Sequence, residues 1–314
     1  MKSQFFNVVK KYGIYLALII LMIFFSVVTE SFLKPDNLFN VARQISMLGI
    51  AAVGMAFVLL LGGIDLSIGS QVTLVNIVAA WLMVKAGIHP FFACCLSLIM
   101  SGAVGFINGW IIANIKMPPL IVTLASMTML EGLAFIICSG IPIFGFPRGF
   151  AVIGQGYLGP IPVPVIIMAA VLAIGAFILN ETFFGRWFYA VGGNEEAANL
   201  SGINVKLVKY LVYTLSGLFA GIAGIVMLSR TNSGQALAGK GFELDVLTAV
   251  VLGGVSVSGG AGKISNVVAG ILILGVLSNG MVLMNITQYS QMLIKGAVLL
   301  IAVGFDCYQK QRQK

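Results

Sequence analysis

Residues 62–70, Gly-Gly-Ile-Asp-Leu-Ser-Ile-Gly-Ser, place polar groups between two long apolar stretches. Asp65 brings a carboxylate, Ser67 brings a hydroxyl, and the glycines release the backbone from helical geometry. Inside a membrane, backbone groups that leave a helix must bond to protein or to water lining a cavity. The segment therefore lies on a pathway for a polar solute, or Asp65 caps the helix that follows it. Both interpretations are kept.

More polar side chains lie inside apolar segments, where an unpaired charge is costly. Glu131 and Lys295 are charged, and they either pair with each other or mark an aqueous path. Neutral hydrogen-bonding groups suit a hydroxylated solute, although each one taken singly is also explained by a bond between helices. The candidates for a translocation path are Asp65, Ser67, Asn76, Asn108, Thr123, Ser126, Thr128 and Asn279.

The sequence does not contain a complete motif for nucleotide binding, metal binding or catalysis. Residues 254–264 resemble a phosphate-binding loop, but G-x-x-x-x-G-K-[ST] needs glycine in place of Val257 and a hydroxyl in place of Ile264. The one histidine, His89, has no second histidine or spaced acid beside it to share a metal. No catalytic triad or pair of helix-spaced carboxylates is possible in the apolar segments. We expect no enzyme activity, no metal and no cofactor bound by this chain.

Composition places these segments in a membrane. Of 314 residues, 59% are hydrophobic and 9% are charged, whereas about a quarter are charged in an ordinary soluble domain. The net charge of +8 does not form a basic face for nucleic acid, because the lysines and arginines lie between apolar segments and at the chain ends. Such a distribution is typical of cytoplasmic loops. The first apolar run follows Lys10 and Lys11 without a small-residue cleavage site, which predicts a retained anchor in a bacterial cytoplasmic membrane.

Hydropathy predicts an all-α membrane protein, a polytopic bundle of about ten transmembrane helices in one domain, residues 1–314. The candidate helices are 12–28, 45–62, 67–86, 91–114, 119–139, 163–180, 206–229, 244–258, 264–284 and 289–306. An even number of crossings puts both termini on one side, and most of the 18 basic residues fall on that side, which we assign to the cytoplasm. They are Lys2, Lys10, Lys11, Lys116, Arg186, Lys206, Lys209, Lys263, Lys310, Arg312 and Lys314.

The connections between these helices differ in character. On the outside, residues 140–162 are rich in glycine and proline and predict an ordered surface turn. On the inside, residues 181–205 form the longest connection, and its aromatic run of Trp187, Phe188 and Tyr189 is poorly placed in water. We therefore expect a partner to bind there.

Glycines recur at the spacing used for close helix contact, as in Gly105-x-x-x-Gly109 and Gly217-x-x-x-Gly221. Small residues let helix backbones approach each other. This spacing favours packing within the bundle over direct contact with a substrate.

Two stretches together resemble the ribose-type sugar ABC permease family: GGIDLSIGS at 62–70, and GRWFYAVGGNEEAANLSGINVKLVKYLVYTLSGLFAGIAGI from Gly185, followed by GFELDVLTAVVLGGVSVSGGAGKI from Gly241. The resemblance runs from the first span to the last. It implies a binding-protein-dependent importer of ribose or another monosaccharide. It further implies a homodimer that carries two ATPase subunits, which bind ATP and Mg²⁺, on its cytoplasmic face and receives sugar from a periplasmic binding protein.

By the same resemblance, part of the 181–205 connection is the segment that couples to the ATPase. These residues are Gly193, Asn194, Glu195, Glu196, Ala197, Ala198, Asn199, Leu200, Ser201 and Gly202. Acids near the start and glycines at the limits suit a short helix.

On the outer side, Arg148, Arg230 and Lys240 are candidates for docking the binding protein, because such docking is usually electrostatic. Ordinary solvated loops are the plain alternative. Three other functions stay open: an importer of another pentose, hexose or furanosyl signalling molecule, a transporter that works without ATP, and a membrane scaffold. The polar break at 62–70 speaks against a scaffold.

Overall fold

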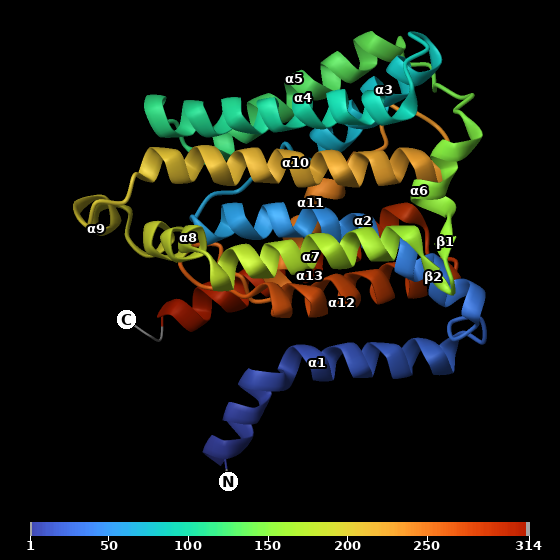
Figure 1. Ribbon diagram of the computed structural model, residues 1–314. Helices are drawn as coiled ribbons and strands as arrows, with labels where there is room; N and C mark the ends of the chain where they lie inside the picture. Colours follow the sequence, from blue (N-terminus) through green and yellow to red (C-terminus); the bar gives the residue numbers. More distant parts are fainter. Residues whose placement is uncertain (1, 312–314) are drawn as a thin grey trace.

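The computed structural model describes residues 2–311, and it describes side chains between residues 13 and 308. Arg312 and Lys314, expected on the cytoplasmic side, lie outside the described residues. Almost all of the described chain is helical, and the long helices lie side by side in a bundle (Figure 1).

Each predicted membrane segment coincides with one helix. These helices are α1 Lys2–Val28, α2 Pro35–Leu60, α3 Ile68–Val84, α4 Pro90–Trp110 with its π-helical continuation η1 Ile111–Ile115, α5 Pro119–Cys138, α7 Val163–Glu181, α10 Val205–Thr231, α11 Phe242–Leu252, α12 Ile264–Leu283 and α13 Gln288–Gln311. Among the described residues, 7 helices are long and apolar enough to cross a membrane, and Gly13–Val28 and Ile68–Val84 are shorter apolar helices. The helical membrane class is thereby established.

Three predicted boundaries are wrong, and the first is the start of α1, which lies at Lys2 instead of residue 12. Helix α2 begins at Pro35, well before residue 45, because proline is suited to the first helical turn. Helix α11 has 11 residues and ends at Leu252 instead of continuing to residue 258. It ends there because Gly253 and Gly254 follow, and Gly254 adopts the left-handed conformation (φ 76°). At about 1.5 Å per residue, α11 rises only ~16 Å, roughly half of a hydrocarbon core.

The two long connections are ordered. Residues 140–162 contain the 3₁₀ turn η2 Arg148–Ala151, helix α6 Val152–Gln155 and an antiparallel pair of two-residue strands, β1 Tyr157–Leu158 and β2 Ile161–Pro162. The predicted ordered surface turn is therefore confirmed. The 181–205 connection is two helices, α8 Phe183–Gly193 and α9 Glu195–Leu200.

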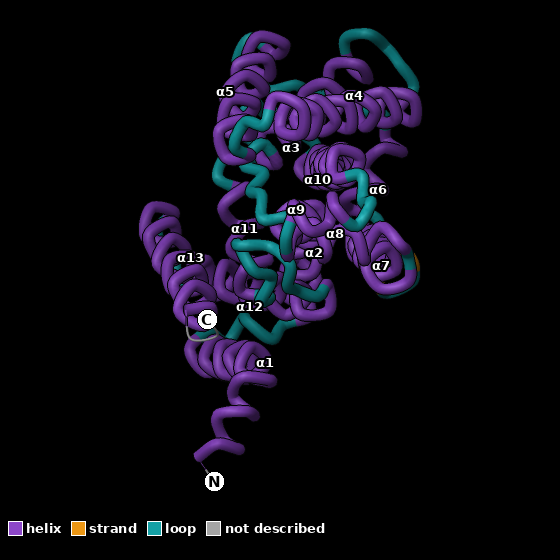
Figure 2. Tube along the Cα trace, turned by 90° about the vertical axis from the view of Figure 1, so that its left-hand side faces the viewer, coloured by secondary structure: helices purple, strands orange, loops and turns teal. Residues whose placement is uncertain are grey.

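Helices α10 and α2 lie near the centre when the bundle is viewed along its axis (Figure 2). A Cβ atom on Gly105 of α4 would lie 2.2 Å from the carbonyl oxygen of Tyr213 in α10, and one on Gly217 of α10 would lie 2.4 Å from that of Ser101 in α4. Only glycine allows this approach. The spaced glycines thus pack helices against each other, as the sequence indicated.

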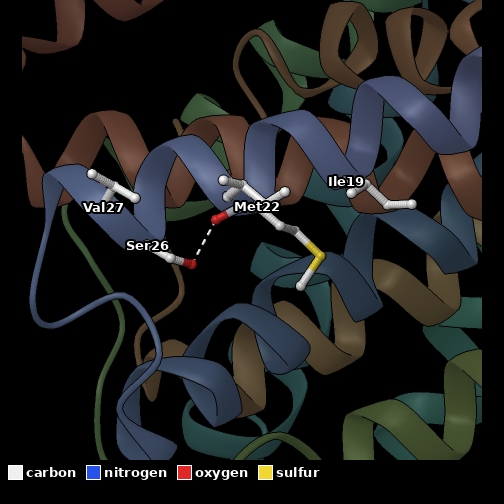
Figure 3. A pocket seen from close by; sticks show the side chains of 5 residues that line it. Ile19, Met22, Ser26 and Val27 are labelled. Atoms are coloured by element: carbon white, nitrogen blue, oxygen red, sulfur yellow. Dashed lines mark hydrogen bonds between the residues drawn. The ribbon is translucent and has the colours of Figure 1, made fainter.

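The described chain ends, the start of α1 and the end of α13, lie at the same end of the bundle as α9 (Figure 1). Helix α1 runs along the edge of the bundle and packs on α12. Its outer side carries a shallow apolar recess lined by Ile19, Met22, Ile23, Ser26 and Val27 (Figure 3). The Ser26 hydroxyl donates to the Met22 carbonyl, 2.6 Å away. The recess therefore presents apolar surface suited to lipid rather than to a sugar.

Candidate functional site

The break between α2 and α3 is a tight turn built around Asp65. Gly62 adopts the left-handed conformation (φ 76°), and the Asp65 carboxylate accepts a bond from the backbone N–H of Ser67 at 3.0 Å and another from the Ser67 hydroxyl. The residue that precedes the first turn of α3 is Ser67. Asp65 therefore closes the turn ahead of the helix and does not cap the N–H groups of the helix itself.

Asp65 also bonds to a helix that is distant in sequence. The Ser216 hydroxyl of α10 donates to its Oδ2 at 2.7 Å. With Ser67 donating twice to Oδ1, the carboxylate accepts three bonds. These three bonds satisfy a carboxyl group that is 0% exposed. Among the described residues, no cation pairs with it.

The Ser67 hydroxyl extends the bonding to α3, α4 and α5. It accepts from Gln71 Nε2 at 2.9 Å and from Asn108 Nδ2 at 3.2 Å, and Asn108 Oδ1 accepts from the hydroxyl of Ser126. Ser101 of α4 lies 3.1 Å from Gln71 Oε1 and 2.7 Å from the Gly217 carbonyl of α10. We call this buried set the polar hub; its members are Asp65, Ser67, Gln71, Ser101, Asn108, Ser126 and Ser216.

The hub brings together Asp65, Ser67, Asn108 and Ser126 of the path candidates. Thr123 adjoins it, because its hydroxyl lies 3.0 Å from the carbonyl of Ile64. All five side chains are buried. In this conformation they bond to protein, as helix-to-helix hydrogen bonds would, and their contact with a solute stays a prediction.

The other three path candidates lie elsewhere. Asn76 Oδ1 accepts from the backbone N–H of Gln235 at 2.9 Å, and Asn279 exchanges amide bonds of 2.8 and 2.9 Å with Asn37. The exposed Thr128 bonds only to the Leu124 carbonyl of its own helix.

Sequence reasoning missed three members of the hub, Gln71, Ser101 and Ser216. Ser216 faces α2, where a Cβ atom on Gly54 would lie 2.8 Å from the Ser216 Cα, and the glycine spacing on α10 marked a different face, the one toward α4. A further polar group lies beside the hub, since the Tyr213 hydroxyl is buried and has no hydrogen-bond partner among the described residues. A Cβ atom on Gly63 would lie 2.5 Å from that hydroxyl.

Of the two interpretations of Glu131 and Lys295, a mutual pair is not what the structure shows, because Lys295 has another partner. Lys295 Nζ of α13 lies 2.7 Å from Asp245 Oδ2 of α11, with both side chains partly exposed. Asp245 borders a cavity of about 180 Å³ between α2, α10, α11 and α12, which Gln44, Arg230 and Ser278 also line. The sequence analysis did not single out Asp245, although this acid lies inside the predicted segment 244–258 and the rule that selected Glu131 and Lys295 also applies to it.

The expected coupling segment contains the short helix α9, as its caps and acids predicted. The Asn194 side chain accepts from the backbone N–H of Ala197 at 2.9 Å, and Glu195 pairs with Lys209 of α10 at 2.7 Å. Ala198 anchors the helix with 4% exposure, whereas Leu200 is 82% exposed. The remaining residues of the segment, Gly193 to Ala197, Asn199, Ser201 and Gly202, are exposed at this end of the bundle.

The aromatic run before α9, Trp187 to Tyr189, makes contacts within the chain itself. Phe188 of α8 is 1% exposed and meets Phe57 of α2 edge-to-face, with ring centroids 5.5 Å apart. The Tyr189 hydroxyl donates to the Gly262 carbonyl at 2.7 Å, and its burial raises the pKa of Tyr189. The argument for an interface therefore fails for Phe188, which the chain's own core covers, whereas Trp187 and Tyr189 are half-buried.

At the opposite end, the docking candidates lie on two segments joined to each other. Gly154 donates to the Ser229 hydroxyl at 2.7 Å, which ties residues 140–162 to the end of α10. Arg148 and Lys240 are exposed, and Arg230 is half-buried. The sequence missed Arg43, whose guanidinium lies 4.7 Å from the ring centroid of Tyr157.

Within the part of the chain that the structure describes, no three His, Cys, Asp or Glu side chains gather as metal ligands would. The arrangement as a whole offers a buried polar hub in a helical bundle, an exposed helix at one end and scattered cations at the other. This arrangement supports hydrogen bonding to a polar solute and movement of helices.

Comparison with known proteins gives a consistent result. Residues 37–303 match the family described as branched-chain amino acid transport system / permease component. The chain is 44% identical over 307 residues to the ribose import permease protein RbsC of Bacillus subtilis, covering 97% of this chain and 95% of that protein. It is 41% identical to RbsC of Escherichia coli K12, covering 93% and 92%, and 39% identical to the L-arabinose transport system permease protein AraH of the same strain, covering 97% and 92%. No solved structure matches.

Proposed function

Because the chain belongs to the family of the branched-chain amino acid transport system / permease component, we propose that it is the membrane-spanning permease subunit of an ABC importer for a monosaccharide, with ribose as the favoured substrate. The observation that carries this proposal is the similarity over nearly the whole chain to ribose import permeases. The protein is a multi-pass protein of the bacterial cytoplasmic membrane.

The substrate follows from the relatives rather than from the broad family description. Relatives at 41 to 44% identity are ribose permeases, and one at 39% is an arabinose permease. The polar hub agrees with a neutral polyol, because hydroxyls and amides surround its single acid. Other pentoses, hexoses and furanosyl signalling molecules are the alternative substrates.

In the membrane, the permease forms one domain, residues 1–314, with about ten helices and both termini in the cytoplasm. The described chain ends and α9 share one end of the bundle, which supports this orientation (Figure 1). The short helix α11 crosses only part of the membrane. Its charged residue Asp245 is paired there with Lys295 of α13, which lowers the cost of placing the acid in the membrane.

The partners are a second copy of the chain, a cytoplasmic ATPase subunit and a periplasmic sugar-binding protein. Helix α9 docks on the ATPase, which is supported by its exposed surface and by Leu200 at 82% exposure. The chain is not an enzyme, since ATP and Mg²⁺ bind to the ATPase subunit. Arg148, Arg230 and Lys240 attract the binding protein at the other end.

Transport then consists of a change of access. Closure of the ATPase dimer moves α9 as a rigid body, and the helices joined through the polar hub shift between outward-open and inward-open arrangements. Asp65, Ser67, Asn108, Thr123 and Ser126 meet the solute when the hub opens. Asn76, Thr128 and Asn279 belong to the path only if the helices that carry them turn toward it.

The test is uptake of labelled ribose into proteoliposomes that contain the permease. Uptake should require ATP, the ATPase subunit and the binding protein together. Unlabelled L-arabinose or L-leucine, added in excess, shows by inhibition of ribose uptake whether the importer accepts another sugar or an amino acid. A secondary transporter, the second candidate, predicts full-speed uptake by the purified chain alone. That result would overturn the proposal. Inhibition of uptake by leucine but not by arabinose would indicate that the substrate is an amino acid.

A further inference from the structure

Residues 253–263 connect α11 to α12, and we call them the relay loop. They resemble a phosphate-binding loop without matching its pattern, so another role must account for their glycines. Gly254, Gly259, Gly260 and Gly262 all have positive φ, and the backbone N–H of Ser256 donates to the Ala261 carbonyl at 2.9 Å. The loop is a folded turn with its own bonds rather than a loose connection.

The relay loop contacts the end of α2 directly before the polar break. The backbone N–H of Gly260 donates to the carbonyl of Leu60, the last residue of α2, at 2.9 Å. A Cβ atom on Gly259 would lie 2.9 Å from the backbone nitrogen of Gly62. Movement of the loop therefore displaces the segment that leads to Asp65.

The loop also contacts α8, the helix that leads into α9. The Tyr189 hydroxyl donates to the Gly262 carbonyl at 2.7 Å. A Cβ atom on Gly192 would lie 1.7 Å from the Leu60 carbonyl oxygen and 2.8 Å from the Gly260 nitrogen. Three backbones meet at this point without room for one methyl group, so they cannot shift independently.

A third contact reaches α13. Asp306 Oδ2 accepts from the Ser256 hydroxyl at 3.1 Å and from the Val257 N–H at 3.3 Å. The relay loop is thus bonded to α2, α8 and α13 and covalently continuous with α11 and α12.

We propose that the relay loop is the mechanical link that carries movement of α8 and α9 to the Asp65 break and to α13. This inference rests on the proposed function, because it assumes that an ATPase moves α9. Tyr189, Gly192 and Asp306 are positioning residues in this link, acting through the loop rather than on the solute. A loosened link lets the ATPase hydrolyse ATP with less movement of the hub.

The experiment uses the reconstituted complex of permease, ATPase and binding protein, and it measures ribose taken up per ATP hydrolysed. Tyr189→Phe removes one hydrogen bond and keeps the ring. Since one such bond contributes about 0.5–1.5 kcal/mol, we expect uptake per ATP to fall about two- to tenfold. Tyr289→Phe, which changes an 84% exposed tyrosine at the other end, is the matched control. The amount of assembled complex and the ATP hydrolysis rate should stay at the level of the unmodified protein.

Asp306→Asn is the second variant, because it weakens the α13 contact without a change in volume. The pair of Gly192→Ala and Gly132→Ala adds a steric comparison, since a Cβ atom on Gly132 of α5 meets nothing within 4 Å. Uptake and hydrolysis that fall in parallel, or unchanged uptake per ATP in both Tyr189→Phe and Asp306→Asn, would overturn the relay. If the unmodified complex shows no ATP-dependent uptake, the proposed function fails instead.

Discussion

Ser216 of α10 donates a hydrogen bond to Asp65, 2.7 Å away, although 151 residues separate them in the sequence. The bond joins the break after α2 to a central helix of the bundle. Because the carboxyl group is 0% exposed, each of its donors contributes to satisfying a polar group that water does not reach. This relationship makes the polar hub a structural centre as well as a candidate for the solute path.

Ser216→Ala should lower the stability of the bundle by about 1–3 kcal/mol, because it leaves a buried oxygen of Asp65 without its hydrogen bond. Thermal unfolding in detergent measures the effect. Thr128→Ala is the control, since this exposed hydroxyl bonds only within its own helix, and it should change stability by less than about 0.5 kcal/mol. Equal transition temperatures for the two variants would contradict the assignment of Ser216 to the hub.

The pair of Lys295 and Asp245 should show coupling in a double-mutant cycle. Because the two side chains are 23% and 31% exposed, solvent screens part of the attraction. We expect a coupling free energy of about 1 kcal/mol between Lys295→Met and Asp245→Asn. The same cycle between Lys295→Met and Glu131→Gln should give a value near zero. Coupling to Glu131 in place of Asp245 would show that the pairing differs from this structure.

Leu200→Asp should weaken assembly with the ATPase subunit. Burial of a leucine side chain contributes about 1.5–3 kcal/mol, so affinity should fall about ten- to a hundredfold. Pull-down or light scattering of the purified subunits measures it. Leu158→Asp is the control, because Leu158 is 69% exposed at the opposite end of the bundle. The combined change of Gly193, Glu195 and Glu196 to Ala should act in the same direction; unchanged assembly in both α9 variants would exclude α9 as the docking helix.

Gly105→Ala should destabilise the contact between α4 and α10 by about 1–3 kcal/mol, since its methyl group would overlap the Tyr213 carbonyl oxygen 2.2 Å away. Gly132→Ala on α5 meets nothing within 4 Å and should be neutral or stabilising by up to about 1 kcal/mol. Transition temperatures of the two variants in the same detergent compare them. A stable Gly105→Ala protein would mean that α4 and α10 are farther apart than described.

The sequence by itself determined the helical membrane class, the approximate position of each long helix and the short helix α9. These features are local, because every segment in a membrane must satisfy its own backbone, and a helix start is specified by adjacent residues such as Asn194. The glycines at 105 and 217 also indicated close packing without indicating which helices meet.

Only the tertiary structure decided which side chains meet across the bundle. Lys295 pairs with Asp245 rather than Glu131, Ser216 reaches Asp65, and Phe188 is buried against Phe57 rather than offered to a partner. Helical periodicity gives the face on which a residue lies, but the neighbouring helix is chosen by packing of the whole bundle. Contacts between residues far apart in the chain are therefore set by the assembled helices, and no local spacing contains them.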